Sequence, residues 1–321
     1  MKKFKYIFLL ISVFTLSCTE NFEEINTDPN NTSAAVFNPN YLLAQSQYDY
    51  SNTGYSQLLF QSMWSQVLAS TFSYYGNGDK YVPSGSFDAY KGRVFEETYR
   101  AATKVYEMQN LTKDKPELSN LYNIGTIMKV LCIARITDTY GDVPYTEALK
   151  AKEGITLPKY DDQSTIYPGL LSELEKAIAA LSTSKTGPTN DLMFKGDVNK
   201  WKKFGNSLML RMAMRLVKVD AAAAKTWAEK AFAGGVFTSV DDNAKVLTDA
   251  SSQSNNTTGA LRVGDDYREV RWSKTFVDYL KNTKDPRISA IAEVSQPGLA
   301  NNSNQELAGD NAEAIQIGLP N

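Results

Sequence analysis

Hydrophobic residues recur every three or four positions over most of the chain beyond residue 38. This spacing places the apolar side chains on one face of a helix. Seven segments show it, at about 38–47, 55–68, 94–111, 117–139, 164–181, 197–217 and 225–232. Signals for strands are few and short. The pattern therefore predicts an all-α fold of tetratricopeptide-like helical hairpins joined by long loops.

Local signals mark several helix ends. Ser164 and Asp197 stand where N-caps are expected, although Pro168 then falls in the first turns of its helix. Gly234-Gly235 is expected to stop the seventh helix. The sixth helix is predicted to turn six residues inward: Val198, Trp201, Phe204, Leu208, Met212 and Leu216.

The N-terminus reads as an export signal. It opens Met-Lys-Lys-Phe-Lys, continues with an apolar run over 6–16, and reaches Cys18 two residues later. The run is shorter than the roughly 20 apolar residues that span a bilayer. Residues 1–17 are therefore predicted to be a signal peptide and 18–37 a linker that begins at a lipidated Cys18. Thr15 departs from the usual lipobox leucine, and an ordinary signal peptide with a chance cysteine is the alternative.

The amino-acid composition excludes several classes of catalytic and binding site. The chain has 34 Lys+Arg, 36 Asp+Glu and no histidine, for a net charge of −2. It lacks the basic excess of a nucleic-acid surface, and it cannot build a histidine-based triad, an HExxH zinc site or a histidine-ligated haem. Gly76-Asn-Gly78 lacks the third glycine of a dinucleotide site, and no EF-hand spacing appears. No cofactor or metal is predicted, and Cys132 falls on an apolar helix face as a small buried hydrophobe.

Three motifs resemble those of one family. Residues 136–148 read Ile-Thr-Asp-Thr-Tyr-Gly-Asp-Val-Pro-Tyr-Thr-Glu-Ala, and 201–211 read Trp-Lys-Lys-Phe-Gly-Asn-Ser-Leu-Met-Leu-Arg. Together with Asp285-Pro286-Arg287 and the lipobox-like N-terminus, they are similar to the SusD/RagB-like outer-membrane nutrient-binding lipoproteins. Members of that family are usually longer, so 38–321 is expected to be a SusD-like helical domain truncated at its C-terminus.

The motifs themselves indicate scaffold. Gly141 can adopt the left-handed conformation that ends the preceding helix, and Pro144 holds Val143 extended. Arg211 and Arg215 lie four residues apart on one helix flank, where a solvated or ion-paired role is expected ahead of anion binding.

The resemblance implies a lipid-anchored protein on the outer face of the outer membrane. Such a protein binds a glycan, or in some members a peptide, and forms a lid over a SusC-like TonB-dependent transporter without catalysing a reaction. The family's ligand contacts follow no motif that transfers to this sequence.

Candidate ligand residues come instead from two polar loops, near 70–90 and 249–266. Sugars pack on flat aromatic faces, and amides and carboxylates bind their hydroxyls. The candidates are Tyr74, Tyr75, Asn77, Asp79, Tyr81, Asp266, Tyr267 and Trp272. Trp64 is predicted to lie in the core, because it falls near the Leu68 side of its helix.

Two other functions remain open from the sequence. A surface glycan hydrolase would use two carboxylates facing each other across a cleft, which needs no histidine. A structural interaction module would use its helical hairpins to hold another protein and would bind no small ligand.

Overall fold

The computed structural model describes residues 36–52, 54, 56–70, 78–82, 85–248, 270–292 and 310–320. The chain divides into two compact units, Met1–Asn38 and Pro39–Asn321, and all features below belong to the second. None of the helices in the described ranges combines the length and the apolar character that crossing a membrane requires.

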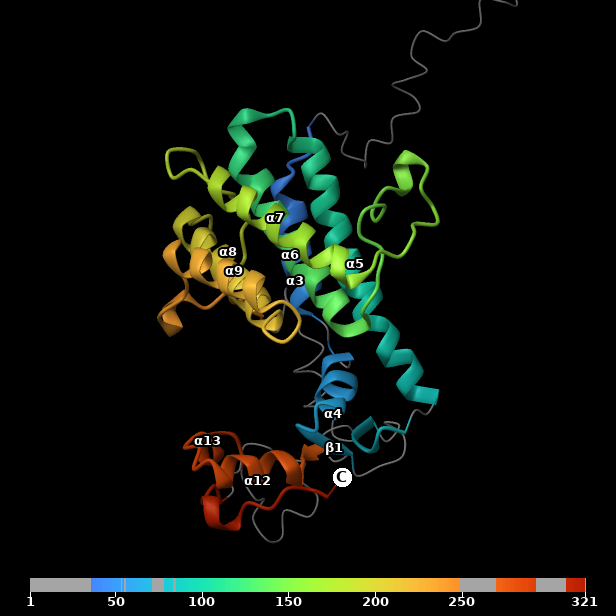
Figure 1. The fold of residues 1–321 in the computed structure, drawn as a ribbon, viewed down its shortest axis with the longest axis vertical. Helices are drawn as coiled ribbons and strands as arrows, with labels where there is room; N and C mark the ends of the chain where they lie inside the picture. The colour runs from blue at the N-terminus through green and yellow to red at the C-terminus, as the bar shows by residue number, and fades with distance from the viewer. Residues whose placement is uncertain are drawn as a thin grey trace, which may run out of the picture. The chain divides into compact units, whose positions relative to one another are not determined.

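Six long helices form the helical part of the second unit. They are α3 (Asn40–Ser51), α5 (Gly85–Thr112), α6 (Ser119–Tyr140), α7 (Gln163–Ala180), α8 (Val198–Arg215) and α9 (Ala221–Ala233). Consecutive helices pack as hairpins, α5 with α6, α6 with α7 and α8 with α9, while α3 packs on α5 (Figure 1). The predicted all-α fold of helical hairpins is confirmed.

Helix α6 forms the centre of the core. Thirteen of its 22 residues are buried, around almost its whole circumference, which is typical of a helix enclosed by others. Cys132 is among them, and burial raises the pKa of its thiol to about 12. The thiol is therefore protonated at neutral pH, as expected of a small buried hydrophobe.

The predicted helix ends are confirmed in part. The Asp197 carboxylate accepts the main-chain N–H groups of Asn199 and Lys200 at 2.9 and 3.1 Å, so it caps α8. Gly234 ends α9 as predicted. The prediction for Ser164 is wrong, because α7 already begins at Gln163 and Asp162 holds the N-cap position.

A second, smaller group of elements includes both strands. Strand β1 (Leu68–Ser70) pairs antiparallel with β2 (Val270–Trp272), which leads into α12 (Lys274–Asn282) and α13 (Ile288–Ile291). Val277, Leu280, Ile288 and Ala292 form a small separate core. Short turns complete the chain: η1 (Ser56–Gln61, a π-helix), α4 (Ser62–Trp64), η3 (Gly78–Lys80), η4 (Pro116–Leu118), η5 (Ala151–Glu153), η6 (Val240–Asp242) and η7 (Glu313–Ile315).

Two segments differ from the predicted helices. The helix expected to continue to Leu68 ends at Trp64, because Gln66 adopts a positive φ of 60° and Leu68 pairs with Trp272. Helix α5 begins at Gly85, inside the stretch expected to be a loop.

Candidate functional site

The 140–146 motif builds a rigid turn after α6. Gly141 ends the helix with φ +79° and ψ −120°, a conformation that glycine accepts readily. Val143 then forms an isolated antiparallel bridge with Asp161. The Asp161 carboxylate accepts the main-chain N–H groups of Tyr145 (3.2 Å) and Thr146 (2.7 Å). Burial opposes its ionisation, but these hydrogen bonds and nearby Lys159 outweigh burial and hold the Asp161 pKa below its usual value.

The tryptophan of the 201–211 motif is the largest fully buried side chain of the described residues. Its indole N–H donates to Asp191 Oδ2 at 2.8 Å. The same carboxylate accepts Gln47 Nε2 (2.7 Å) and the N–H groups of Met193 and Gly196 (both 3.0 Å). Asp191 thus joins α3, α8 and the loop between α7 and α8.

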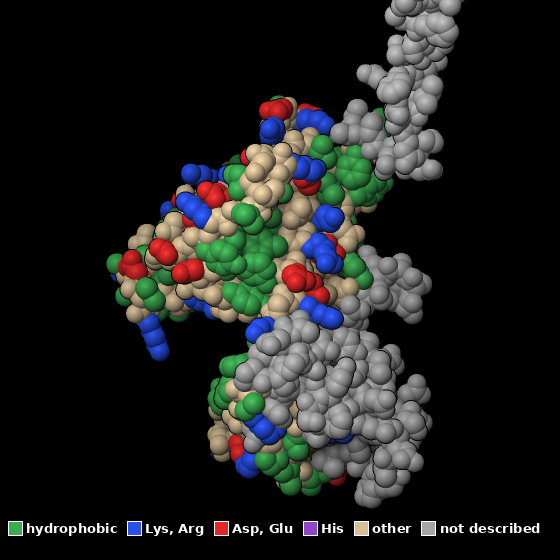
Figure 2. All heavy atoms as spheres, turned by 90° about the vertical axis from the view of Figure 1, so that its right-hand side faces the viewer, with side chains coloured by type: hydrophobic (Ala, Val, Ile, Leu, Met, Phe, Trp, Pro, Cys, Tyr) green, Lys and Arg blue, Asp and Glu red, His purple; other side chains and the backbone are tan. Residues whose placement is uncertain are grey.

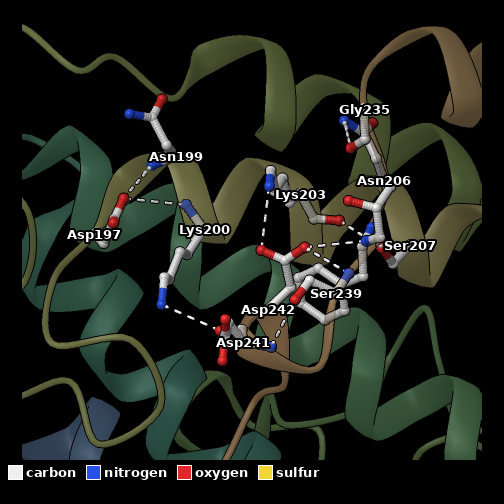
Figure 3. A network of polar contacts seen from close by, with 12 residues as sticks. Asp197, Asn199, Lys200, Lys203, Asn206, Ser207, Gly235, Ser239, Asp241 and Asp242 are labelled. Atoms are coloured by element: carbon white, nitrogen blue, oxygen red, sulfur yellow. Dashed lines mark hydrogen bonds and ion pairs between the residues drawn. The ribbon is translucent and has the colours of Figure 1, made fainter.

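The polar residues of the same motif hold the chain that follows α9 (Figure 3). Asn206 Nδ2 donates to the carbonyls of Gly234 and Gly235 at 2.7 and 3.2 Å. Lys203 pairs with Asp242 at 3.1 Å. The structure therefore agrees with the interpretation of both motifs as scaffold.

The arginine flank of α8 is used within the fold. Arg215 Nε pairs with Asp138 Oδ2 at 3.1 Å, which ties α8 to the end of α6. Arg211 is hydrogen-bonded to Tyr50. This bond favours the ionised phenol, but burial has the larger effect and raises the pKa of Tyr50. An ion-paired role, as expected from the sequence, accounts for Arg215.

Exposed aromatic rings gather at α4 and η3. Trp64 is 37% exposed and Tyr81 53% exposed, and their rings meet edge to face with centroids 5.1 Å apart. Phe60 lies behind Trp64 at 6.5 Å. We call these residues the Trp64–Tyr81 surface. The prediction of a core position for Trp64 is wrong. It assumed that the helix continues to Leu68, but the helix ends at Trp64, so the helical spacing no longer places the two residues on one face.

Asp79, predicted as a ligand contact, is buried in the fold. Its side chain is buried, with the residue 1% exposed, and its Oδ2 accepts the Ser70 N–H at 3.1 Å and pairs with Lys80 at 3.2 Å. Its carbonyl accepts Gln66 Nε2 at 2.5 Å. Asp79 therefore fixes the turn that presents Tyr81 through its carbonyl and its Oδ2.

Trp272 lines a cavity of about 250 Å³ together with Arg271, Val277 and Gln316. Its ring packs on Phe276 with centroids 5.3 Å apart, and its N–H donates to the Ile291 carbonyl at 2.9 Å. The ring is half-buried, so part of it faces solvent.

The other predicted residues lie outside the described part of the chain. They are Cys18, Tyr74, Tyr75, Asn77, Asp266 and Tyr267. Ser70, the last described residue before 71–77, and Val270, the first after 249–269, are partners in the β1–β2 ladder. The segments that hold the two groups of predicted residues therefore both adjoin the Ser70–Val270 end of the β1–β2 ladder. The sequence does not show this, because the two strands are far apart along the chain.

Two features of the described residues bear on bond chemistry. Among them, no three carboxylate or thiol side chains are grouped to hold a metal. In the linings of two cavities along α5, α6 and α7 and of the cavity at Trp272, Glu173 is the one carboxylate, whereas glycoside hydrolysis generally needs a pair. Figure 2 shows a face on which hydrophobic side chains gather in a patch on the helical part, with basic and acidic side chains around it.

Comparison with known proteins gives a family and a fold. Residues 29–320 match the SusD-like family model described as starch-binding and associating with the outer membrane. A solved chitin-binding protein is 32% identical, with a TM-score of 0.69 over 78% of this chain and 54% of its own. A SusD-like protein of Bacteroidetes is 28% identical, with a TM-score of 0.69 over 78% and 50%.

A chitin-binding SusD homologue from Flavobacterium johnsoniae is 27% identical, with a TM-score of 0.66 over 78% of this chain and 53% of its own. The chain thus spans about half the length of these solved structures. A search of curated proteins found no match.

Proposed function

Because the chain belongs to the SusD-like family, described as starch-binding and associating with the outer membrane, we propose that it captures a glycan at the cell surface. Two similar solved proteins, described as chitin-binding, support a glycan cargo. In the proposed cycle the protein binds the glycan without cleaving it and delivers it to a SusC-like TonB-dependent transporter.

The Trp64–Tyr81 surface is the observation that carries the binding role. Two exposed rings held edge to face offer apolar faces to the C–H groups of a sugar at little cost in side-chain entropy. Asp79 holds the Tyr81 turn through Gln66 and Ser70, so the platform is formed before a ligand arrives. Trp272 belongs to β2, the partner strand of β1, and lines a cavity there. Tyr74, Tyr75, Asn77, Asp266 and Tyr267 remain predicted contributors.

Anchoring and delivery are further parts of the proposal. We expect residues 1–17 to be removed and Cys18 to carry the lipid that holds the protein on the outer membrane. A Cys18→Ala variant should leave the membrane fraction, and the wild-type protein should co-purify with a large outer-membrane protein in mild detergent. A Cys18→Ala protein that stays in the membrane fraction would contradict the anchor.

Glycan binding is tested by isothermal titration of the chain from Thr19 onward with chitin and starch hexasaccharides. We expect Trp64→Ala and Tyr81→Ala each to weaken binding by about 10-fold, since stacking on an aromatic ring contributes on the order of 1 kcal/mol or more. Tyr160→Ala removes a more exposed ring elsewhere and should bind normally. Equal affinities in the wild type and the three variants would show that the glycan does not bind at the Trp64–Tyr81 surface.

The same samples test the hydrolase alternative. Reducing ends should not accumulate when the protein is incubated with a bound polysaccharide. New reducing ends would identify a hydrolase, whereas binding of peptides but of no glycan would change the cargo class.

A further inference from the structure

A polar groove runs along α5, α6 and α7, apart from the aromatic rings described above. It consists of two adjoining cavities of about 260 and 320 Å³ that share Tyr106, Lys129 and Glu173. We call it the α5–α7 groove. The smaller cavity continues to Tyr145 and Lys150, and the larger one is lined by Gln109, Asn110, Lys113, Tyr122, Asn123, Thr126, Lys176 and Ala177.

The floor of the groove is fixed by polar contacts. Glu173 Oε2 pairs with Lys129 Nζ at 2.6 Å, and its Oε1 accepts the Tyr145 hydroxyl at 2.8 Å. Gln109 Nε2 donates to Thr126 Oγ1 at 2.8 Å and so joins α5 to α6. The single carboxylate of the groove is therefore already paired with groups of the fold, Oε2 with Lys129 and Oε1 with Tyr145.

The groove carries an excess of positive charge. The larger cavity is lined by Lys113, Lys129 and Lys176 against Glu173 alone. Lys113 and Lys176 are exposed, and neither forms an ion pair with a carboxylate of the described residues. With Lys129 and Glu173 paired to each other, two ammonium groups remain available to a ligand, beside the amides of Asn110 and Asn123. This lining suits a ligand that carries carboxylates as well as hydroxyls.

An aromatic ring is held where the two cavities meet. Tyr106 lines both, and its hydroxyl donates to Glu153 in η5. The neighbouring residue Lys152 pairs with Glu107 of α5 at 2.7 Å, so this turn is fastened to α5 at two points. The Tyr106 ring is thereby positioned for contact with an extended ligand that enters both cavities.

We propose that the α5–α7 groove is a second binding site, and that it takes an acidic oligosaccharide, a chain of sugars bearing carboxylates. An acidic peptide fits less well. Peptides are usually held by a strand edge or by apolar anchor pockets, and Ala177 is the one aliphatic side chain that the described residues contribute to the larger, lysine-lined cavity, whereas Ile133, Ala148 and Leu149 line the smaller one. The proposal rests on the proposed function only for the class of cargo, since the groove shares no residue with the Trp64–Tyr81 surface.

The test is isothermal titration of the chain from Thr19 onward with hexagalacturonate, maltohexaose and hexaglutamate. Hexagalacturonate should bind, and its affinity should fall several-fold between 50 and 300 mM NaCl, because salt screens exposed charges. The double variant Lys113→Glu/Lys176→Glu should lose at least 10-fold in affinity. A charge-matched control, Lys218→Glu/Lys245→Glu, places the same reversal on exposed lysines outside the groove and should bind as the wild type does.

Three results would overturn the proposal: no binding of hexagalacturonate, an equal loss in the control variant, or tighter binding of hexaglutamate, which would assign the groove to acidic peptides. A different set of results would contradict the proposed function while leaving the groove in place. If Trp64→Ala and Tyr81→Ala leave neutral glycans bound normally while Lys113→Glu/Lys176→Glu releases hexagalacturonate, the groove stands and the aromatic surface does not.

Discussion

Two tryptophans, Trp201 in the helical part and Trp272 beside the β1–β2 ladder, show how differently the two regions are built. Both donate their indole N–H to an oxygen of the fold at 2.8–2.9 Å. Trp201 is fully buried and bonded to a carboxylate, whereas Trp272 is half-buried and bonded to a main-chain carbonyl. The family-like residues of the helical part maintain the fold, while the aromatic rings of the other region stay partly open to solvent.

The hydrophobic core of the helical part is also larger than the core beside the β1–β2 ladder. Counting described residues alone, the main cluster of buried apolar side chains has 27 members, while the cluster under α12 and α13 has four. Regions with few buried contacts open locally at a lower free energy than the global core. A ligand surface placed on such a region is able to adjust to its ligand without unfolding the helices.

The comparison predicts its largest effect at Trp201. Trp201→Ala should lower the free energy of unfolding by about 4 kcal/mol, because it leaves a large cavity and deprives Asp191 of a hydrogen bond. Urea unfolding followed by circular dichroism measures it. Trp201→Phe, which keeps most of the volume, should cost less than half as much. A loss below 1 kcal/mol for the alanine variant would contradict the difference between the regions.

Asp161 should come next. Asp161→Ala removes an acceptor from two main-chain N–H groups and from the Thr146 hydroxyl, and we expect a loss of about 2–3 kcal/mol. The neighbouring Asp162 is exposed and caps no N–H group with its side chain, so Asp162→Ala is the matched control and should change stability little. Equal losses in both variants would show that the turn does not depend on the Asp161 carboxylate.

Trp272→Ala should have a smaller and more local effect. We expect a loss of about 1–2 kcal/mol, because the ring is only half-buried and packs mainly on Phe276. Hydrogen exchange should speed up in 270–292 and stay unchanged in α6. If protection is lost in α6 as well, the two regions unfold together and the comparison fails.

The smallest predicted effect is a dependence on acid. A hydrogen bond from the Arg287 guanidinium holds the pKa of Asp285 at about 2, below its value in an unfolded chain. The carboxylate is then fully ionised, and its stabilisation complete, above about pH 4, and this contribution is lost as the pH falls through 2. Wild type and Asp285→Asn should therefore differ in stability at pH 5 and converge near pH 2. A constant difference would rule out this pair as the cause.

Local signals in the sequence predicted most of the helical part, apart from the cap of α7 and the start of α5. Asp197 caps its helix and Trp201 packs inward because both outcomes depend on residues within one or two turns. The end of the helix at Trp64 was missed, because β1 is formed by a partner strand far along the chain. The burial of Asp79 was missed for the same reason, since its partner Ser70 belongs to that ladder.

The α5–α7 groove was also outside the reach of the sequence. Lys113, Lys129 and Lys176 lie in or beside three successive helices, and each alone is an ordinary surface lysine. Their convergence depends on how α5, α6 and α7 pack, which the periodicity of each helix does not specify. The exposure of aromatic residues was hard to predict for a similar reason. A helical pattern shows which face of a helix a residue lies on, but it does not show which other element covers that face.

The hydrogen bond from the Ser273 hydroxyl to the Gln66 carbonyl joins residues 207 positions apart. A contact of that span closes slowly in an unfolded chain, and a folded intervening segment shortens the loop. Strand β1 has no strand partner until the chain has been synthesised past Trp272. We therefore expect the helices to form first and the turn bearing Trp64 and Tyr81 to be completed last. An interrupted translation product would then have a folded body without its binding surface.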